Sequence, residues 1–268
     1  MSNYTVESSP VETSDGVKLH ARLFKPTGEI KDNLVVVLVH PYSILGACQG
    51  LLKGMAAGLA EKGYRAVTFD TRGAGRSSGR ASLTGFAEIK DVDAVCKWVC
   101  LDLSVDRTLL VGSSAGRMNI VHARGQQWET QTSGPSPEIF CSDTISSFIQ
   151  NQLAMRRGGP TGAPIAGSAV DQIEQVVGYV SLGYPFGMTA SILFGRHHNS
   201  ILKSPKPKLL VMGTRDGFTS VKQLNNKLSS AAGRVETHLI EGLSHFQMEG
   251  PSYDVQMVNL ILEFVASL

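Results

Sequence analysis

The chain has 268 residues, 42% of them hydrophobic, which fits one packed globular domain. Its formal net charge is only +2 and its Lys and Arg residues are dispersed, so we expect no nucleic-acid partner. The N-terminus has no basic segment followed by an apolar core, and no apolar run approaches the roughly 20 residues that span a bilayer, so we expect a cytoplasmic protein without a membrane partner.

The first third of the chain alternates predicted strands with a predicted helix. Apolar and polar residues alternate on both sides of Asp15-Gly16, which is a hairpin signal and indicates antiparallel edge strands. The next apolar run is rich in valine, as expected for a strand buried on both faces of a parallel sheet. The elements predicted here are a hairpin within 6–23, a strand at 34–39, a helix at 51–62 and a strand at 64–69.

The same alternation resumes further along the chain, with helical periodicity in some stretches and short apolar runs in others. It predicts an α/β fold with a mostly parallel central sheet, helices on both faces and an antiparallel N-terminal hairpin. Ligands of such sheets gather beyond the carboxyl ends of the strands. The predicted elements are a helix at 86–103, strands at 108–111, 176–182, 208–212 and 235–240, and helices at 220–231 and 253–266.

Residues 117–162 interrupt this alternation. They are polar, rich in helix breakers and without a sustained period, although they follow a strand where a helix with small residues is expected. Residues 163–170 supply such a helix, with Pro164 suited to its first turn. We therefore hypothesise that 1–268 is a single domain and that 117–162 is an atypical insertion, consistent with an altered transcript, that forms a poorly ordered excursion. An ordinary cap or lid is the alternative.

The most informative local pattern is Gly112-Ser113-Ser114-Ala115-Gly116, at the end of the 108–111 strand. Gly-x-Ser-x-Gly in this position predicts a sharp turn that holds Ser114 strained and exposed, because a side chain at either glycine would collide with backbone. With 28 glycines in the chain the pattern is weak by itself. It needs partner residues elsewhere.

Two further residues follow strands in matching positions. Asp216 comes just after the 208–212 strand and His245 just after the 235–240 strand, so the chain order is Ser, Asp, His. The loop after the 176–182 strand contains no carboxylate, and the other histidines do not lie in a loop after the last strand. This order predicts acyl transfer in which Ser114 attacks, His245 takes and returns the proton, and Asp216 orients His245.

The chain resembles the α/β-hydrolase superfamily, in particular small cap-poor hydrolases with a His-Pro motif after the third strand and a Phe-Asp-x-Arg-Gly-x-Gly-x-Ser motif after the fourth. The matching residues are His40-Pro41 and Phe69–Ser77, together with Ser114, Asp216 and His245. The resemblance covers nearly everything except 117–162.

The resemblance implies an oxyanion hole and a bracing pair. One oxyanion donor would be the backbone N–H of Ala115, and the second would be that of Tyr42, because Pro41 has no N–H. Asp70 and Arg72 would brace the loops by hydrogen bonds and ion pairing.

The expected function is that of a carboxylesterase-like serine hydrolase. It would cleave an ester or thioester of a small to medium apolar acyl group through an acyl-enzyme. The substrate would be a small molecule, and no cofactor is expected. Its rate should rise with pH as His245 loses its proton. Apolar residues between 182 and 208, such as Phe186, either line a pocket or form the buried face of a helix. The alternatives are a non-catalytic ligand-binding or scaffolding protein, or an isoform that the 117–162 insertion disables. The sequence indicates no oligomeric state.

Neither the cysteines nor the paired histidines indicate a metal site. Cys96 and Cys100 lie one helical turn apart and read as two buried thiols, and the four cysteines form no disulfide framework. His197-His198 reads as a solvated or partly packed pair, because no ligand lies at suitable spacing nearby.

Overall fold

The computed structural model describes residues 2–41, 49–82, 84–114 and 161–268, apart from the side chains of 188–194 and Phe246. The strands are β1 (Tyr4–Glu12), β2 (Lys18–Pro26), β3 (Leu34–Val39), β4 (Arg65–Phe69), β5 (Arg107–Ser113), β6 (Val176–Leu182), β7 (Lys208–Gly213) and β8 (Val235–Ile240). The α-helices are α1 (Lys53–Glu61), α2 (Ile89–Leu103), α4 (Gly162–Ala169), α5 (Met188–Lys203), α6 (Val221–Leu228) and α7 (Asp254–Ala266), and the 3-10 helices are η1 (Gln49–Leu52) and η2 (His245–Gln247).

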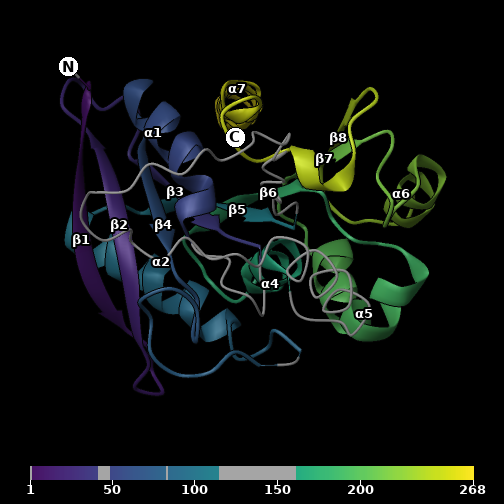
Figure 1. The fold of residues 1–268 in the computed structure, drawn as a ribbon, viewed down its shortest axis with the longest axis horizontal. Helices are drawn as coiled ribbons and strands as arrows, with labels where there is room; N and C mark the ends of the chain where they lie inside the picture. The colour runs from purple at the N-terminus through teal and green to yellow at the C-terminus, as the bar shows by residue number, and fades with distance from the viewer. Residues whose placement is uncertain (1, 42–48, 83, 115–160) are drawn as a thin grey trace, which may run out of the picture.

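These strands form one sheet in the order β1-β2-β4-β3-β5-β6-β7-β8. β1 pairs antiparallel with β2, and β2 with β4, while all other neighbours run parallel. Figure 1 shows α1 and α7 on one face of the sheet and α2, α4 and α5 on the other. The predicted mostly parallel sheet with helices on both faces and an N-terminal hairpin is confirmed.

Two apolar cores lie on the two faces of the sheet, because neighbouring residues of a strand point to opposite faces. In β3, Val35, Val37 and Val39 pack with α2 and α4, whereas Val36 and Leu38 pack with α1 and α7. Every residue of β3 is buried. The valine-rich run therefore predicted a central strand correctly.

The helices differ from the predicted ranges mainly at their ends. α2 begins at Ile89, three residues after the predicted start, because the preceding stretch forms a loop in which the Glu88 carboxylate accepts hydrogen bonds from Ser82 N–H and Oγ–H. α1 ends at Glu61, and Gly63 then adopts a φ of +92°, a conformation that glycine reaches without steric cost.

Cys96 and the paired histidines His197 and His198 are all buried. Cys96 is buried, and burial raises the pKa of its thiol. His197 and His198 are 0% and 3% exposed, so the expectation of a solvated or only partly packed pair is wrong. Phe86 stacks on His197, while Tyr184 and Phe186 contact the ring of His198.

Among the described residues, no group of His, Cys, Asp and Glu side chains could hold a metal ion. In that same part of the chain, no helix combines the length and apolarity that crossing a membrane requires.

Candidate active site

Ser114 lies directly after β5, and its backbone N–H donates to the carbonyl oxygen of Leu182 at the end of β6, at 2.9 Å. A Cβ on Gly112 would come within 2.7 Å of the backbone of α4 at Gly162 and Ala163, which is why the strand can carry only glycine there. This close approach is the one that the Gly-x-Ser-x-Gly pattern predicted.

The predicted exposure of Ser114 is wrong. Ser114 is 0% exposed, and its side chain lies against Thr161, the residue before α4. In the described ranges, Ser104 is the only non-glycine residue with a positive φ, so Ser114 does not adopt a left-handed backbone conformation. The turn that follows Ser114 lies outside the described residues.

Asp216 lies in the loop after β7, as predicted, and its carboxylate is held by the loop's own backbone. Its Oδ1 accepts the N–H groups of Phe218 and Thr219 at 2.8 and 2.9 Å. The hydroxyl of Thr219 in turn donates to the carbonyl oxygen of Tyr184 and accepts the N–H of Phe186. These bonds tie the loops after β6 and β7 together and fix the direction of the carboxylate.

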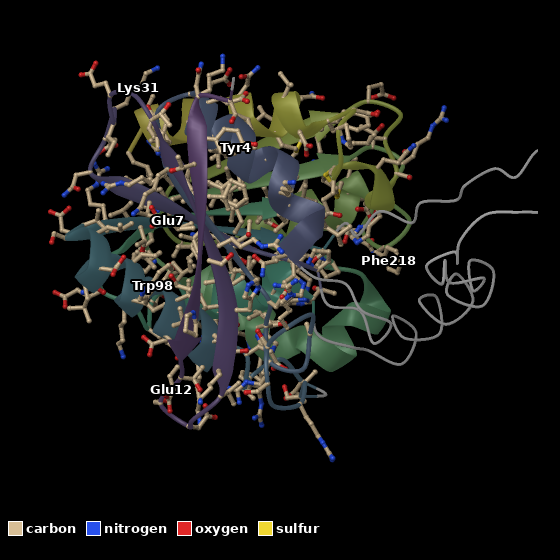
Figure 2. The ribbon with its side chains drawn as sticks, turned by 60° about the vertical axis from the view of Figure 1, so that its left-hand side comes forward. Tyr4, Glu7, Glu12, Lys31, Trp98 and Phe218 are labelled. Atoms are coloured by element: carbon tan, nitrogen blue, oxygen red, sulfur yellow. The ribbon has the colours of Figure 1, made fainter. Side chains whose placement is uncertain are left out.

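His245 begins η2, shortly after β8, and contacts both other predicted residues. Its Nδ1 lies 2.6 Å from Oδ2 of Asp216, and the two side chains are 1% and 0% exposed. Its Nε2 lies 3.1 Å from the backbone carbonyl oxygen of Ser114. The ring of Phe218 packs against the imidazole with centroids 4.6 Å apart, and Figure 2 shows Phe218 on the side of the molecule away from β1.

The hydroxyl of Ser114 itself faces a residue that was not predicted. Its Oγ donates to Oγ1 of Thr161 at 2.8 Å. The structure therefore brings the backbone of Ser114, the ring of His245 and the carboxylate of Asp216 together, but the serine hydroxyl is bonded to Thr161. Sequence reasoning missed Thr161 because it fell within the presumed insertion, although a threonine just before a predicted helix is a common N-cap signal.

The two predicted oxyanion donors, Tyr42 and Ala115, lie outside the described residues. The His-Pro motif that precedes Tyr42 is described. His40 is buried, its Nδ1–H donates to the carbonyl oxygen of Pro41, and its Nε2 accepts the N–H of Thr71 at 3.1 Å. Burial lowers the pKa of His40, so the ring is neutral and fixes the end of β3.

Asp70 of the second motif braces the loop after β4. Burial alone would raise the pKa of Asp70, but N–H groups of Gln49 and Arg76 donate to its carboxylate, outweigh that effect and lower the pKa.

Arg72 links the same loop to α2 and to the hairpin. Its guanidinium bonds Asp91 of α2 at 2.7 Å and Asp15 of the hairpin at 3.0 Å. Burial opposes the charge, yet the hydrogen bonds to the two carboxylates raise the pKa of Arg72. Both motif residues brace loops, as the resemblance implied.

Solved structures of α/β hydrolases are similar to this chain over almost its whole length. A serine hydrolase homologue from Coxiella burnetii is 22% identical, with a TM-score of 0.65, over 98% of this chain and 97% of the other. An esterase from Pyrococcus furiosus is 16% identical, with a TM-score of 0.65, over 98% and 91%. A serine hydrolase without a lid from Xanthomonas campestris is 16% identical, with a TM-score of 0.66, over 98% and 94%.

Two sequence comparisons each match less than half of the chain. Residues 15–132 match the X-Pro dipeptidyl-peptidase (S15 family). An uncharacterised 31.7 kDa protein of Escherichia coli, from the traX-finO intergenic region, is 32% identical over 118 residues, 42% of this chain. The match spans only 39% of that relative. The chain thus has the α/β-hydrolase fold.

Proposed function

We propose that this protein is a serine hydrolase that cleaves an ester or thioester through an acyl-enzyme on Ser114. The observation that carries the proposal is the buried Asp216–His245 pair, whose imidazole reaches Ser114 at the carboxyl end of β5. In the neutral ring, Asp216 keeps the hydrogen on Nδ1, so Nε2 carries the lone pair that can accept the Ser114 proton once the hydroxyl turns toward it. A general base in this position can take the serine proton.

The reaction follows from these positions. Oγ of Ser114 forms a bond to the acyl carbon while its proton passes to Nε2 of His245. The imidazolium then gives that proton to the departing alcohol or thiol as the bond to it breaks. Water, deprotonated by the same ring, releases the acid and restores Ser114. Backbone N–H donors at Tyr42 and Ala115 are proposed to stabilise the oxyanion.

An apolar acyl group of modest size is the proposed substrate. The ring of Phe218, which packs on the imidazole, supplies an apolar surface beside the base. Phe186, one of the candidates for a pocket wall, is only 2% exposed and stacks on Tyr184, so it belongs to the core. Small p-nitrophenyl esters are therefore the first substrates to test, with X-Pro dipeptide amides as the comparison that the family match suggests.

Labelling with a fluorophosphonate, followed by intact mass and peptide mapping, tests the proposal. We expect a single adduct on Ser114 that is absent from Ser114→Ala and at least 100-fold slower in His245→Ala. Melting temperatures of the variants close to that of the wild type would show that they remain folded. A folded wild-type protein that takes up no label, or Ser114→Ala protein with full esterase activity, would overturn the proposal.

A ligand-binding protein on the same fold, or a disabled form, is the second candidate. One observation favours it: the Ser114 hydroxyl bonds Thr161 rather than His245. Stoichiometric capture of an ester without repeated turnover would support this alternative over the hydrolase.

A further inference from the structure

The nucleophile and the base are adjacent, but their reacting atoms are not bonded to each other. Oγ of Ser114 donates to Oγ1 of Thr161, while Nε2 of His245 contacts the backbone oxygen of Ser114. Ser114 and Thr161 are 0% and 3% exposed, so water does not replace this contact. A hydroxyl has one hydrogen to donate, and therefore Thr161 and His245 are alternative acceptors for the same proton.

Thr161 can accept the hydrogen bond from Ser114 because a proline stands three residues later, in the first turn of α4. It is the N-cap of the helix, with extended backbone angles (φ −114°, ψ 152°), and its side chain makes no capping hydrogen bond. An N-cap threonine ordinarily accepts the N–H of the third helical residue. Here that residue is Pro164, which has no N–H. The lone pairs of Oγ1 are left for Ser114.

The position of Thr161 is fixed by the glycine that follows it. A Cβ on Gly162 would lie within 2.6 Å of the backbone oxygens of Val39, His40 and Ser113, so the start of α4 is pressed onto the ends of β3 and β5. Thr161 cannot retreat from Ser114 without moving this junction. A substitution at Thr161 that keeps the shape of its side chain therefore changes the hydrogen bond and little else.

On the basis of the proposed hydrolase function, we propose that Thr161 is a positioning residue that holds the Ser114 hydroxyl away from His245 in the resting enzyme. Attack requires Ser114 to rotate about its Cα–Cβ bond, from the staggered position that faces Thr161 to one that faces Nε2. Its proton then passes to His245 as Oγ bonds the acyl carbon. The bond to Thr161 must break first, and its free energy adds to the barrier for acylation.

Thr161→Val is the decisive variant, because valine keeps the branched shape and removes the acceptor. We expect acylation of Ser114, measured with a fluorophosphonate and as kcat for p-nitrophenyl acetate, to be about fivefold faster, which corresponds to the roughly 1 kcal/mol of a net hydrogen bond. KM should stay within about twofold of the wild type, since substrate binding does not involve this bond. Thr161→Ser, which restores a hydroxyl, should return the rate toward the wild-type value.

Thr237→Val on the exposed face of β8 is the matched control and should leave the rate unchanged. A general structural disturbance would slow acylation and lower the melting temperature. Faster acylation in Thr161→Val therefore could not be explained by such a disturbance. If Thr161→Val proves poorly folded, Thr161→Ala must shift the rate in the same direction.

An unchanged or slower rate in well-folded Thr161→Val protein would overturn the role of Thr161 while leaving the hydrolase intact. Failure of every variant, Thr161→Val included, to label at Ser114 would instead overturn the proposed function.

Discussion

The two halves of the candidate site, the proposed acid–base pair and the proposed nucleophile, are built differently. In the first half, Asp216 is held by two N–H groups of its own loop and bonds His245 at 2.6 Å. In the second half, Ser114 depends on the docking of α4, and its hydroxyl bonds Thr161, which lies 47 positions further along the chain. The first half is complete as the structure stands, whereas the second is adjacent but not aligned.

The difference shows that a local turn can orient the carboxylate that holds His245. The direction of the Ser114 hydroxyl, at the end of a strand, depends instead on the residues that pack against it. The carboxylate of Asp216 is oriented by Phe218 and Thr219, neighbours that the sequence supplies within three residues. The orientation of Ser114 is decided by a helix that reaches it only after the long 115–160 segment. Four predictions test this difference between the two halves.

Disabling the acid–base half should have the largest effect. Asp216→Asn can keep an oxygen for the two N–H groups but presents an amide to Nδ1, which favours the wrong tautomer of His245. We expect kcat to fall on the order of 10⁴-fold with little change in melting temperature. Asp93→Asn, which removes an exposed ion pair with Lys97, is the control and should have no effect. A fall of less than tenfold would mean that the reaction does not use this half.

Disturbing the packing of α4 on the sheet should slow labelling of Ser114, by a smaller factor than Asp216→Asn lowers kcat. Gly162→Ala places a methyl group against backbone oxygens that cannot move aside, so we expect about 2 kcal/mol lower stability and roughly 100-fold slower labelling of Ser114. Gly167→Ala in the same helix is the matched control, because its nearest neighbours would be 3.5 Å away. Equal effects of the two substitutions, by urea denaturation and labelling rate, would contradict the contrast.

Acid should lower the free energy of unfolding, because His198 packs against the loop that is bonded to the Asp216 loop. Burial lowers the pKa of His198 from 6.5 to about 4. Between these values the unfolded chain binds a proton that the folded protein does not, so stability falls as pH drops from about 6.5 to 4, by at most about 3 kcal/mol. The ring packs on Tyr184 and Phe186, whose backbone Thr219 ties to the acid loop.

His198→Phe should therefore flatten the pH dependence of the unfolding free energy in this window. The comparison needs only the slopes of the two proteins, measured by denaturant titration at several pH values. Parallel slopes would show that another group is responsible.

Removing 117–162 should have the smallest effect on stability. The joined chain places Gly116 before Ala163, where Gly162 stands now, and so preserves the glycine that the junction with β5 requires. A shorter connection costs less conformational entropy to close, so the melting temperature should rise. The rise should be only a few degrees, because this cost grows slowly with loop length. Labelling should be kept or become faster, because Thr161 is removed as well. Loss of folding would refute the insertion hypothesis.

Sequence patterns were enough to predict most of the strands and helices in their order along the chain, and to place Asp216 and His245 directly after two of the strands. These depend on local signals: the apolar run of β3, the hairpin at Asp15-Gly16, and polar residues that follow strands directly. Asp216 and His245 could be found because strand ends in a parallel sheet face one edge. Even the start of α4 near Pro164 followed from local composition.

Only the tertiary structure decided where the Ser114 hydroxyl points and that His197 and His198 are buried. No pattern in the chain links Ser114 to Thr161, because their contact arises from the packing of α4 on the ends of β3 and β5. The burial of the two histidines likewise depends on residues that other elements bring to α5. Local preference fixes elements, but contacts between distant segments exist only once those elements have packed.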